Sequence, residues 1–324
     1  MPKAILVHEY GAADVMRWEE TEVGKPGPDK VLVRHAAIGL NYIDVYYRRG
    51  AYRASKLPFI PGMEAVGRIE ALGPNVRDFQ VGDRVAYAGV IGAYVEQRIM
   101  PADQLVKVPD AVDDRAAAAM MLKGMTAQCL LRRVYSVKAG DVIVFHAAAG
   151  GVGLIACQWA KHLGATVIGT VGSDNKAELA AAYGCDRPVV YTREDFVAEV
   201  KKITGGEGVR VVYDSVGKDT FTRSLSCLRP FGLMVSFGQS SGSVEPFDIS
   251  VLSQKGSLFL TRPTLMTYVA KREDLLRTAD ELFDVVGGGS VKIEIGQTFA
   301  LCDTKDAHRA LEARETTGST VLIP

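Results

Sequence analysis

The sequence predicts an α/β protein in which a β-rich domain is joined to a doubly wound parallel sheet. Three observations lead to this fold class. The chain has 324 residues, more than one hydrophobic core usually serves. Residues 1 to about 124 contain apolar runs of strand type separated by turn residues. From about Lys138 to Thr261, short apolar strands alternate with helices, an arrangement that favours a parallel sheet.

The composition excludes several classes of function. Lys and Arg total 38, as do Asp and Glu, so the formal net charge is zero. This balance argues against nucleic acid and anionic membranes as partners. The apolar run at the amino terminus is too short for a signal peptide, and no apolar run in the chain is long enough to span a bilayer. Five scattered cysteines without a C-x-x-C motif indicate reduced thiols, so we expect a cytoplasmic protein.

The first and last sections of the chain are expected to form one domain. Its predicted early strands are Val31–Ile38, Ala65–Leu72 and Asp83–Tyr87. After Pro263 follow a long helix, Arg272 to Val286, then a strand and a final helical segment. This tail is too short to form a third domain. We therefore expect it to pack on the first section, which makes the parallel-sheet domain an insertion.

The middle section carries the signals of the doubly wound sheet. Six strands are predicted: Val142–His146, Ala165–Thr170, Pro188–Tyr191, Val209–Asp214, Leu233–Phe237 and Ser257–Thr261. Helices are predicted at Gly151–Leu163, Asp174–Tyr183 and Glu194–Ile203. In the first helix Val152, Ile155, Trp159 and Leu163 share one face, as expected of a helix packed on a sheet.

The turn between the first of these strands and its helix has the features of a phosphate cradle. It reads Phe145-His-Ala-Ala-Ala-Gly-Gly-Val-Gly153, close to G-x-G-x-x-G. Gly150 and Gly153 keep the second and third glycines, for approach to the pyrophosphate and for helix packing. Ala148 replaces the first, which is tolerable if its φ is negative. The context of strand, turn and helix predicts a Rossmann dinucleotide-binding domain.

The residues after the second strand favour NADPH over NADH. An Asp or Glu there would bind the ribose hydroxyls of NAD, but Thr170-Val-Gly-Ser173 ends this strand. Lys176 could pair with a 2′-phosphate, and Tyr191 could donate its hydroxyl. Asp174 is also near and could weaken the preference. Alternatively, Lys176 is an ordinary exposed lysine and Tyr191 a strand aromatic.

The chain resembles a known family over nearly its whole length. Besides the segment Phe145–Lys161, the motifs are Gly39-Leu-Asn-Tyr-Ile-Asp44, Leu122-Lys-Gly-Met-Thr126, Val211-Val-Tyr-Asp-Ser-Val-Gly217 and Leu260-Thr-Arg-Pro263. They resemble the zinc-free, ζ-crystallin-like NADPH:quinone oxidoreductases of the medium-chain dehydrogenase/reductases. The resemblance implies a GroES-like β-rich catalytic domain, residues 1–124 and 264–324, and an inserted Rossmann domain, residues 125–263. It also implies a homodimer, with a homotetramer as the alternative.

The resemblance and the strand ends supply candidate site residues. Those expected at the cofactor are Asn41, Tyr46, Thr126, Ala149, Gly150, Gly151, Val152, Gly153, Gly172, Ser173, Lys176, Tyr191, Ser215, Phe237, Gly238, Gln239, Arg262 and Arg314. Those expected to position the substrate are Asn41, Asp44, Tyr46 and Tyr52, in a polar, tyrosine-rich stretch. Any one of these tyrosines could instead belong to the core or the rim. His146 is more readily interpreted as a strand-end hydrogen-bonding group than as a base.

No metal is expected. Zinc enzymes of the same superfamily carry a Cys in the early strand–helix turn and a Gly-His-Glu downstream. This chain has Leu40-Asn41 in the first place and Gly62-Met-Glu64 in the second. Two carboxylates, Asp44 and Glu64, without thiolate or imidazole make a poor zinc site.

The expected reaction is direct hydride transfer from NADPH to a quinone, a small-molecule substrate. The protein would contribute orientation and a partly dry site. One-electron transfer is a variant of the same reaction. An NADPH-dependent enone or enoyl reductase is the nearest alternative, and it would need a tyrosine as proton donor. A non-enzymatic NADPH- or RNA-binding crystallin-like protein is the alternative from another class. The zero net charge weighs against RNA.

Overall fold

The computed structural model describes all residues, 1–324, as two compact units. The first unit comprises Met1–Met125, Val269–Gly287 and Ile293–Pro324, and the second Thr126–Tyr268 and Gly288–Lys292. The sequence predicted that the inserted domain ends at residue 263, whereas the second unit continues to Tyr268. The short return at 288–292 has a local cause. Gln158 donates to the carbonyl of Lys292 at 3.0 Å and accepts from its N–H at 2.9 Å.

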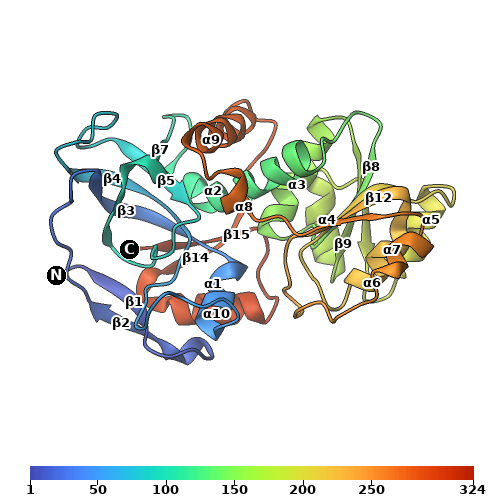
Figure 1. Ribbon diagram of the computed structural model, residues 1–324, viewed down its shortest axis with the longest axis horizontal. Helices are drawn as coiled ribbons and strands as arrows, with labels where there is room; N and C mark the ends of the chain where they lie inside the picture. The colour runs from blue at the N-terminus through green and yellow to red at the C-terminus, as the bar shows by residue number, and fades with distance from the viewer. The chain divides into compact units, whose positions relative to one another are not determined.

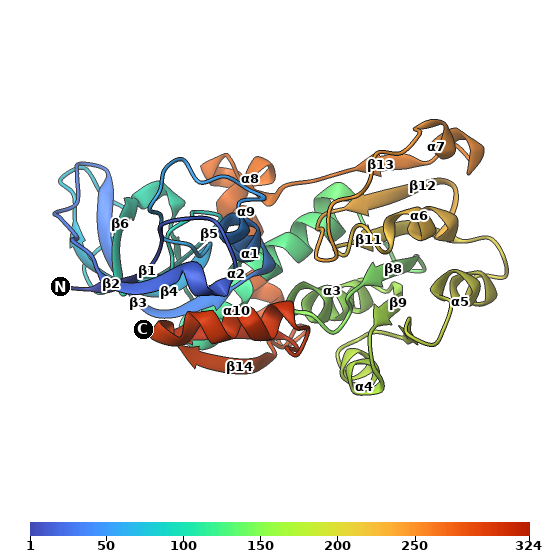
Figure 2. The same cartoon turned by 90° about the horizontal axis from the view of Figure 1, so that it is seen from below.

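The second unit is built on a six-stranded sheet. Its strands are β8 (Val142–His146), β9 (Thr166–Val171), β10 (Arg187–Val190), β11 (Val209–Asp214), β12 (Leu228–Ser236) and β13 (Phe259–Thr261). They lie in the order β10-β9-β8-β11-β12-β13, and every neighbouring pair is parallel. Figure 2 shows β13 beside β12 at the edge of this sheet. The predicted doubly wound parallel sheet is confirmed.

The helices of the second unit join and cover these strands. They are α3 (Gly151–His162), α4 (Asp174–Ala182), α5 (Phe196–Ile203), α6 (Phe221–Ser224), α7 (Ser250–Gln254) and α8 (Leu265–Tyr268), with a π-helix at Cys129–Val134 and a 3-10 turn at Leu225–Cys227. Buried Val144, Ile168, Val212, Met234 and Phe196 belong to one core between sheet and helices. The strand order reverses between β8 and β11, and ligands of such sheets bind at the carboxyl ends near this point.

The first unit contains two sheets. Its strands are β1 (Lys3–Val7), β2 (Met16–Glu20), β3 (Lys30–Leu40), β4 (Glu64–Leu72), β5 (Arg84–Ala88), β6 (Gln97–Pro101), β7 (Val106–Lys107), β14 (Ile295–Ala300) and β15 (Ser319–Ile323). β1 and β2 pair with each other. The larger sheet has the order β14-β15-β3-β4-β5-β7, with β6 also paired to β3. The carboxyl-terminal strand β15 thus lies antiparallel to β3 in the middle of the sheet.

The helices of the first unit place chain segments of distant sequence together. They are α1 (Tyr42–Arg49), α9 (Arg272–Gly287) and α10 (Thr304–Glu312), with 3-10 turns at Ala13–Val15, Ala102–Gln104 and Leu301–Asp303. Helix α2 (Asp114–Gln128) runs from the first unit into the second. Figure 1 shows α10, in red, against α1, in blue. None of the helices is long and apolar enough to cross a membrane.

Candidate functional site

The turn between β8 and α3 has the geometry of a phosphate cradle. A Cβ on Gly153 would lie 2.4 Å from the carbonyl oxygen of Ala147 and 2.6 Å from that of Ala148, so only glycine fits. Gly150 is the N-cap of α3, and a Cβ there would meet nothing closer than 3.2 Å. The first turn of α3 carries no acidic side chain. Its free N–H groups are therefore available to an anion.

The alanine at the first glycine position is accommodated as the sequence required. The left-handed residue of the turn is Ala147, with a φ of 55°, and not Ala148. Ala148 is buried, and a Cβ on Gly169 of the neighbouring strand would lie 2.6 Å from its Cβ. A side chain at position 148 therefore fits because position 169 has none.

The end of β9 carries the residues that the sequence assigned to the ribose and its phosphate. A Cβ on Gly172 would lie 3.0 Å from the hydroxyl oxygen of Tyr191, so this hydroxyl lies directly over Gly172. Ser173 caps α4, accepting from the backbone N–H of Lys176 at 3.4 Å. Asp174 is paired with Arg193, a residue that the sequence did not single out.

The carboxyl ends of β11, β12 and β13 bring five more predicted residues together. A Cβ on Gly238 would lie 2.6 Å from the carbonyl oxygen of Ser215, so these two loops touch. Arg262 donates to Ser236 Oγ at 3.3 Å and to Gln239 Oε1 at 2.9 Å. The Phe237 ring packs on Phe145, with centroids 5.7 Å apart.

Buried polar groups hold these strand ends. Asp214 is fully buried, and its Oδ1 accepts the N–H groups of Val216 at 2.8 Å and Gly217 at 3.0 Å. His146 lies between Thr170 Oγ1, at 2.8 Å, and Ser224 Oγ, at 2.9 Å. Burial lowers the pKa of His146, and the ring has no exposed surface. It is a strand-end hydrogen-bonding group and reaches no ligand.

In the first unit, Asn41 and Asp44 lie at the start of α1, and both side chains are buried. Asn41 is the N-cap, and its backbone N–H donates to Asp44 Oδ2 at 2.9 Å in a capping box. Asn41 Nδ2 donates to Glu64 Oε1 at 2.7 Å. Asp44 has no exposed surface, and burial raises the pKa of its carboxyl to about 7. Its carboxyl group therefore cannot touch a substrate in this conformation.

Glu64 is saturated with hydrogen-bond donors. Its Oε1 accepts from Lys123 Nζ at 2.6 Å as well as from Asn41, and its Oε2 accepts from the N–H of Leu122 at 2.6 Å. Glu64 is fully buried and Lys123 nearly so. The lysine ammonium lies where a cation bound to Glu64 would lie, and no group of three His, Cys, Asp or Glu side chains is arranged to hold a metal. These residues do not fit a zinc ion.

The tyrosines of α1 form an aromatic cluster. The ring centroids of Tyr46 and Tyr52 are 5.3 Å apart, and those of Tyr47 and Tyr52 5.7 Å, both in edge-on geometry. Tyr42 packs in the same way on Tyr46 at 5.4 Å. The N–H of Tyr52 donates to the carbonyl of Tyr46 at 3.1 Å. Tyr46 and Tyr52 are therefore held together, with their hydroxyls on half-buried rings.

A buried chain of hydrogen bonds behind α1 escaped the sequence interpretation. Arg48 donates to His308 Nδ1 at 3.2 Å, and Tyr94 lies between His308 Nε2, at 3.1 Å, and Asp44 Oδ2, at 2.8 Å. Because an arginine can only donate, His308 must carry its proton on Nε2 and donate it to Tyr94. Arg48 in turn pairs with Glu312 at 2.8 Å. The unusual Lys123 in an apolar helix was a usable signal for buried charge, whereas Tyr94 and His308 offered none.

The remaining predicted residues lie at scattered places. Ala149 is buried in the β8–α3 turn, and Thr126 lies on α2 at the start of the second unit. Arg314 follows α10 in the first unit, exposed and left-handed with a φ of 61°.

Comparisons with known proteins agree with this geometry. The family described as zinc-binding dehydrogenase matches residues 151–283, and the alcohol dehydrogenase GroES-like domain matches residues 27–110. A quinone oxidoreductase of Pseudomonas aeruginosa is 51% identical to this chain, and the alignment covers 100% of both proteins. A 2-haloacrylate reductase of a Burkholderia species is 45% identical to this chain, and the alignment covers 100% of this chain and 99% of that protein. The crystal structure of Escherichia coli quinone oxidoreductase complexed with NADPH superimposes with a TM-score of 0.98 at 46% identity, covering 99% of this chain and 100% of that one.

Proposed function

Because this chain belongs to the quinone oxidoreductases of the zinc-binding dehydrogenase family, we propose that it reduces quinones with NADPH by direct hydride transfer and without a metal. The comparisons confirm the predicted family, the enzyme class, the GroES-like and Rossmann fold and the NADPH cofactor. The observation that carries the proposal is the Gly153 turn, too tight for any side chain, followed by a strand end at which the Tyr191 hydroxyl lies over Gly172 and Ser173 caps the helix that carries Lys176. When bound, NADPH supplies the hydride.

The roles proposed for the second unit follow from its local geometry. The N–H groups at the start of α3 bind the pyrophosphate, and Gly150 and Gly153 let the backbone approach it. Lys176 and Tyr191 bind the 2′-phosphate. Residues at the strand ends hold the ribose and nicotinamide: Ser215, Phe237, Gly238, Gln239 and Arg262.

In the first unit, Tyr46 and Tyr52 are proposed to orient the quinone oxygens. Their mutual edge-on contact reduces the freedom of both rings, which favours one substrate orientation. Asn41 directs both of its side-chain N–H groups inward, to Glu64 and to the carbonyl of Gly39. Asn41 caps the helix that carries Tyr46, so its proposed role is to hold this helix and its tyrosine in place. Asp44 acts behind it, through the backbone of Asn41.

The absence of a metal step is supported by Glu64. A zinc ion would have to displace the Lys123 ammonium and two further donors from one buried carboxylate. Met63 precedes Glu64 where zinc enzymes of this superfamily carry histidine. No other group of side chains offers a substitute site.

The similarity to a 2-haloacrylate reductase supports the second candidate, reduction of an electron-poor alkene. That reaction needs a proton donor for the α-carbon, and a tyrosine hydroxyl would be suitable. Tyr46→Phe and Tyr52→Phe separate the two reactions. An alkene reductase loses most of its kcat in one of these variants, whereas a quinone reductase keeps kcat within a few-fold because the reduced quinone takes its protons from water.

The direct test is an NADPH-oxidation screen across quinones, enones and 2-alkenals, with EDTA present. We expect the highest kcat/KM with a quinone, unchanged by the chelator. The proposal fails if alkenes are the better substrates or if EDTA removes the activity. Titration with NADPH and NADH gives the cofactor preference in the same preparation, and equal Kd values would contradict the assignment of NADPH.

A homodimer formed through β13 is the proposed assembly. β13 is the edge of its sheet, with unpaired backbone groups, and several large apolar side chains near it are exposed: Phe231, Ile249, Phe259 and Leu260. A second copy that pairs the same edge about a two-fold axis covers them and closes the assembly. Sedimentation should show a dimer, and Leu260→Pro, which blocks edge pairing, should show a monomer.

A cytoplasmic location is proposed from the cysteines. All five are free, and four of them are buried. Free thiols persist in a reducing compartment.

A further inference from the structure

An acidic residue, Asp174, follows β9 at the place proposed for the 2′-phosphate, where its negative charge would repel the phosphate. Asp174 is the first residue of α4, directly after Ser173, and its side chain is 64% exposed. A carboxylate at this end of a Rossmann unit accepts hydrogen bonds from ribose hydroxyls and repels a phosphate. Asp174 alone would therefore favour NADH, contrary to the cofactor of the family.

Arg193 is paired with Asp174 through both of its terminal nitrogens. Nη1 lies 2.7 Å from Oδ2, and Nη2 lies 2.6 Å from Oδ1, which is the two-point geometry of a guanidinium on a carboxylate. The hydrogen bond from Arg193 lowers the pKa of the Asp174 carboxyl, so the carboxyl is ionised at neutral pH and both of its oxygens are engaged.

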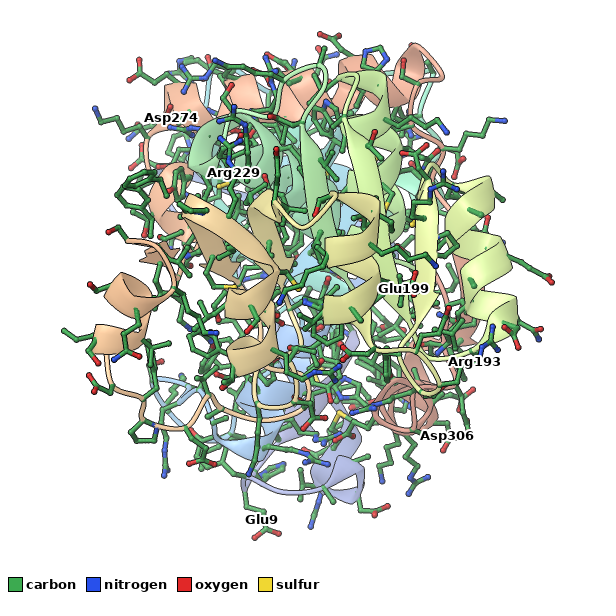
Figure 3. The ribbon with its side chains drawn as sticks, turned by 90° about the vertical axis from the view of Figure 1, so that its right-hand side faces the viewer. Glu9, Arg193, Glu199, Arg229, Asp274 and Asp306 are labelled. Carbon is green, nitrogen blue, oxygen red and sulfur yellow. The ribbon has the colours of Figure 1, made fainter.

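The arginine is held at this place by the segment that carries it. Residues 191–193 lie opposite residues 172–174: the Tyr191 hydroxyl lies over Gly172, and Thr192 Oγ1 donates to the Gly172 carbonyl at 3.4 Å. Figure 3 labels Arg193, whose side chain lies at the surface. The same short segment thus brings a hydroxyl to Gly172 and a guanidinium to Asp174, on either side of the helix cap Ser173.

We propose that Arg193 is a specificity-determining residue for NADPH, which occupies Asp174 and supplies a cation to the 2′-phosphate. The inference rests on the proposed function. The two-point pair uses one N–H of each terminal nitrogen, so the other guanidinium N–H groups can donate to the 2′-phosphate while Asp174 stays paired. Without Arg193 the pocket holds a free carboxylate, which suits the 2′-hydroxyl of NADH.

The test is a set of four variants titrated with NADPH and with NADH. Arg193→Ala removes a cation and exposes Asp174, so the Kd for NADPH should rise by about tenfold while that for NADH stays equal or falls. Asp174→Asn removes the competitor, so the Kd for NADPH should fall. The double variant should bind NADPH more tightly than Arg193→Ala alone. Arg223→Ala is the matched control, because Arg223 forms a similar exposed pair with Asp195 at 2.7 Å; it should leave both Kd values unchanged.

The two proposals fail in different ways. If the wild-type protein binds NADPH no better than NADH, the assignment of the cofactor is wrong. The inference is overturned if the wild-type protein prefers NADPH but Arg193→Ala changes both Kd values equally or leaves both unchanged. Arg193 would then only connect its loop to α4 through Asp174. Binding of 2′,5′-ADP against 5′-AMP isolates the phosphate: Arg193→Ala should weaken the former only. Equal loss of both would also overturn the inference.

Discussion

At the scale of single residues, the most informative group is the buried ion pair of Glu64 and Lys123. Their side chains are 0% and 7% exposed, and Nζ lies 2.6 Å from Oε1. The other donors to Glu64, Asn41 and the N–H of Leu122, do not carry a positive charge. Lys123 is therefore the group that neutralises this carboxylate in the interior.

Lys123→Met should destabilise the protein by about 3–5 kcal/mol, because it leaves a buried carboxylate without its counter-ion. Urea unfolding measures the loss. Lys161→Met is the control, since Lys161 is 57% exposed in its pair with Asp186 and its loss should cost at most about 1 kcal/mol. Adding Glu64→Gln to Lys123→Met should recover much of the loss. Equal effects of the two lysine variants would refute the role assigned to the buried pair.

The same residues show what the sequence could and could not predict about the site. Asn41 and Asp44 were predicted from the family resemblance and from the polar, tyrosine-rich stretch that contains them, and they do lie together at the start of α1. The partner of Asn41 is Glu64, that of Asp44 is Tyr94, and Glu64 in turn binds Lys123; these three come from other segments. Contacts at sequence separations of 23 to 59 residues leave no local periodicity, so only the folded chain reveals them.

At the scale of elements, the tight turn from β8 to α3 predicts which of its glycines can be replaced. Gly153→Ala places a methyl group against two backbone carbonyls, and backbone cannot move aside as a side chain can. The variant should lose about 1–3 kcal/mol of stability and bind NADPH at least about tenfold more weakly, because α3 is displaced from the phosphates. Fluorescence titration and thermal unfolding measure the two effects.

Gly150→Ala is the matched variant in the same turn. The nearest atom to its Cβ would be 3.2 Å away, and its φ of −84° is allowed for any residue. It should fold with nearly unchanged stability. If Gly150→Ala were as damaging to stability as Gly153→Ala, close helix packing would not be the reason for the third glycine.

The elements of the second unit were predictable because their strands and helices are local and repeat. Most of their bounds shifted by at most two residues, as at β10, expected to start at Pro188 and found at Arg187, but β12 starts at Leu228, five residues before the predicted Leu233. The left-handed conformation of Ala147 was not predictable, because alanine carries no signal for a positive φ. The pairing of Asp174 with Arg193 was also missed, since the two residues lie on different elements.

At the scale of the whole molecule, four buried titratable groups make stability depend on pH: His35, His146, His308 and Asp44. Burial lowers the pKa of His35 and of His308 to about 3, and it raises the pKa of Asp44 to about 7. Between pH 3 and 6.5 each histidine takes up a proton only on unfolding, so stability falls as the pH falls. Between pH 3.8 and 7 Asp44 takes up a proton only when folded, so its contribution to stability rises as the pH falls.

Burial also lowers the pKa of His146, so three buried histidines stand against one buried carboxyl, and unfolding takes up at least about one proton on balance between pH 6.5 and 4. The unfolding free energy should therefore fall by at least about 1.4 kcal/mol per pH unit in this window. His308→Gln keeps an acceptor for Arg48 and a donor for Tyr94 but cannot titrate. Its unfolding free energy should fall less steeply with falling pH than that of the wild type, by about 1.4 kcal/mol per pH unit, because one histidine fewer takes up a proton on unfolding. Urea unfolding at half-unit steps decides the matter: an unchanged slope in His308→Gln would mean that His308 is already protonated in the folded protein, and the hydrogen-bond chain from Arg48 to Asp44 would have to run in another direction.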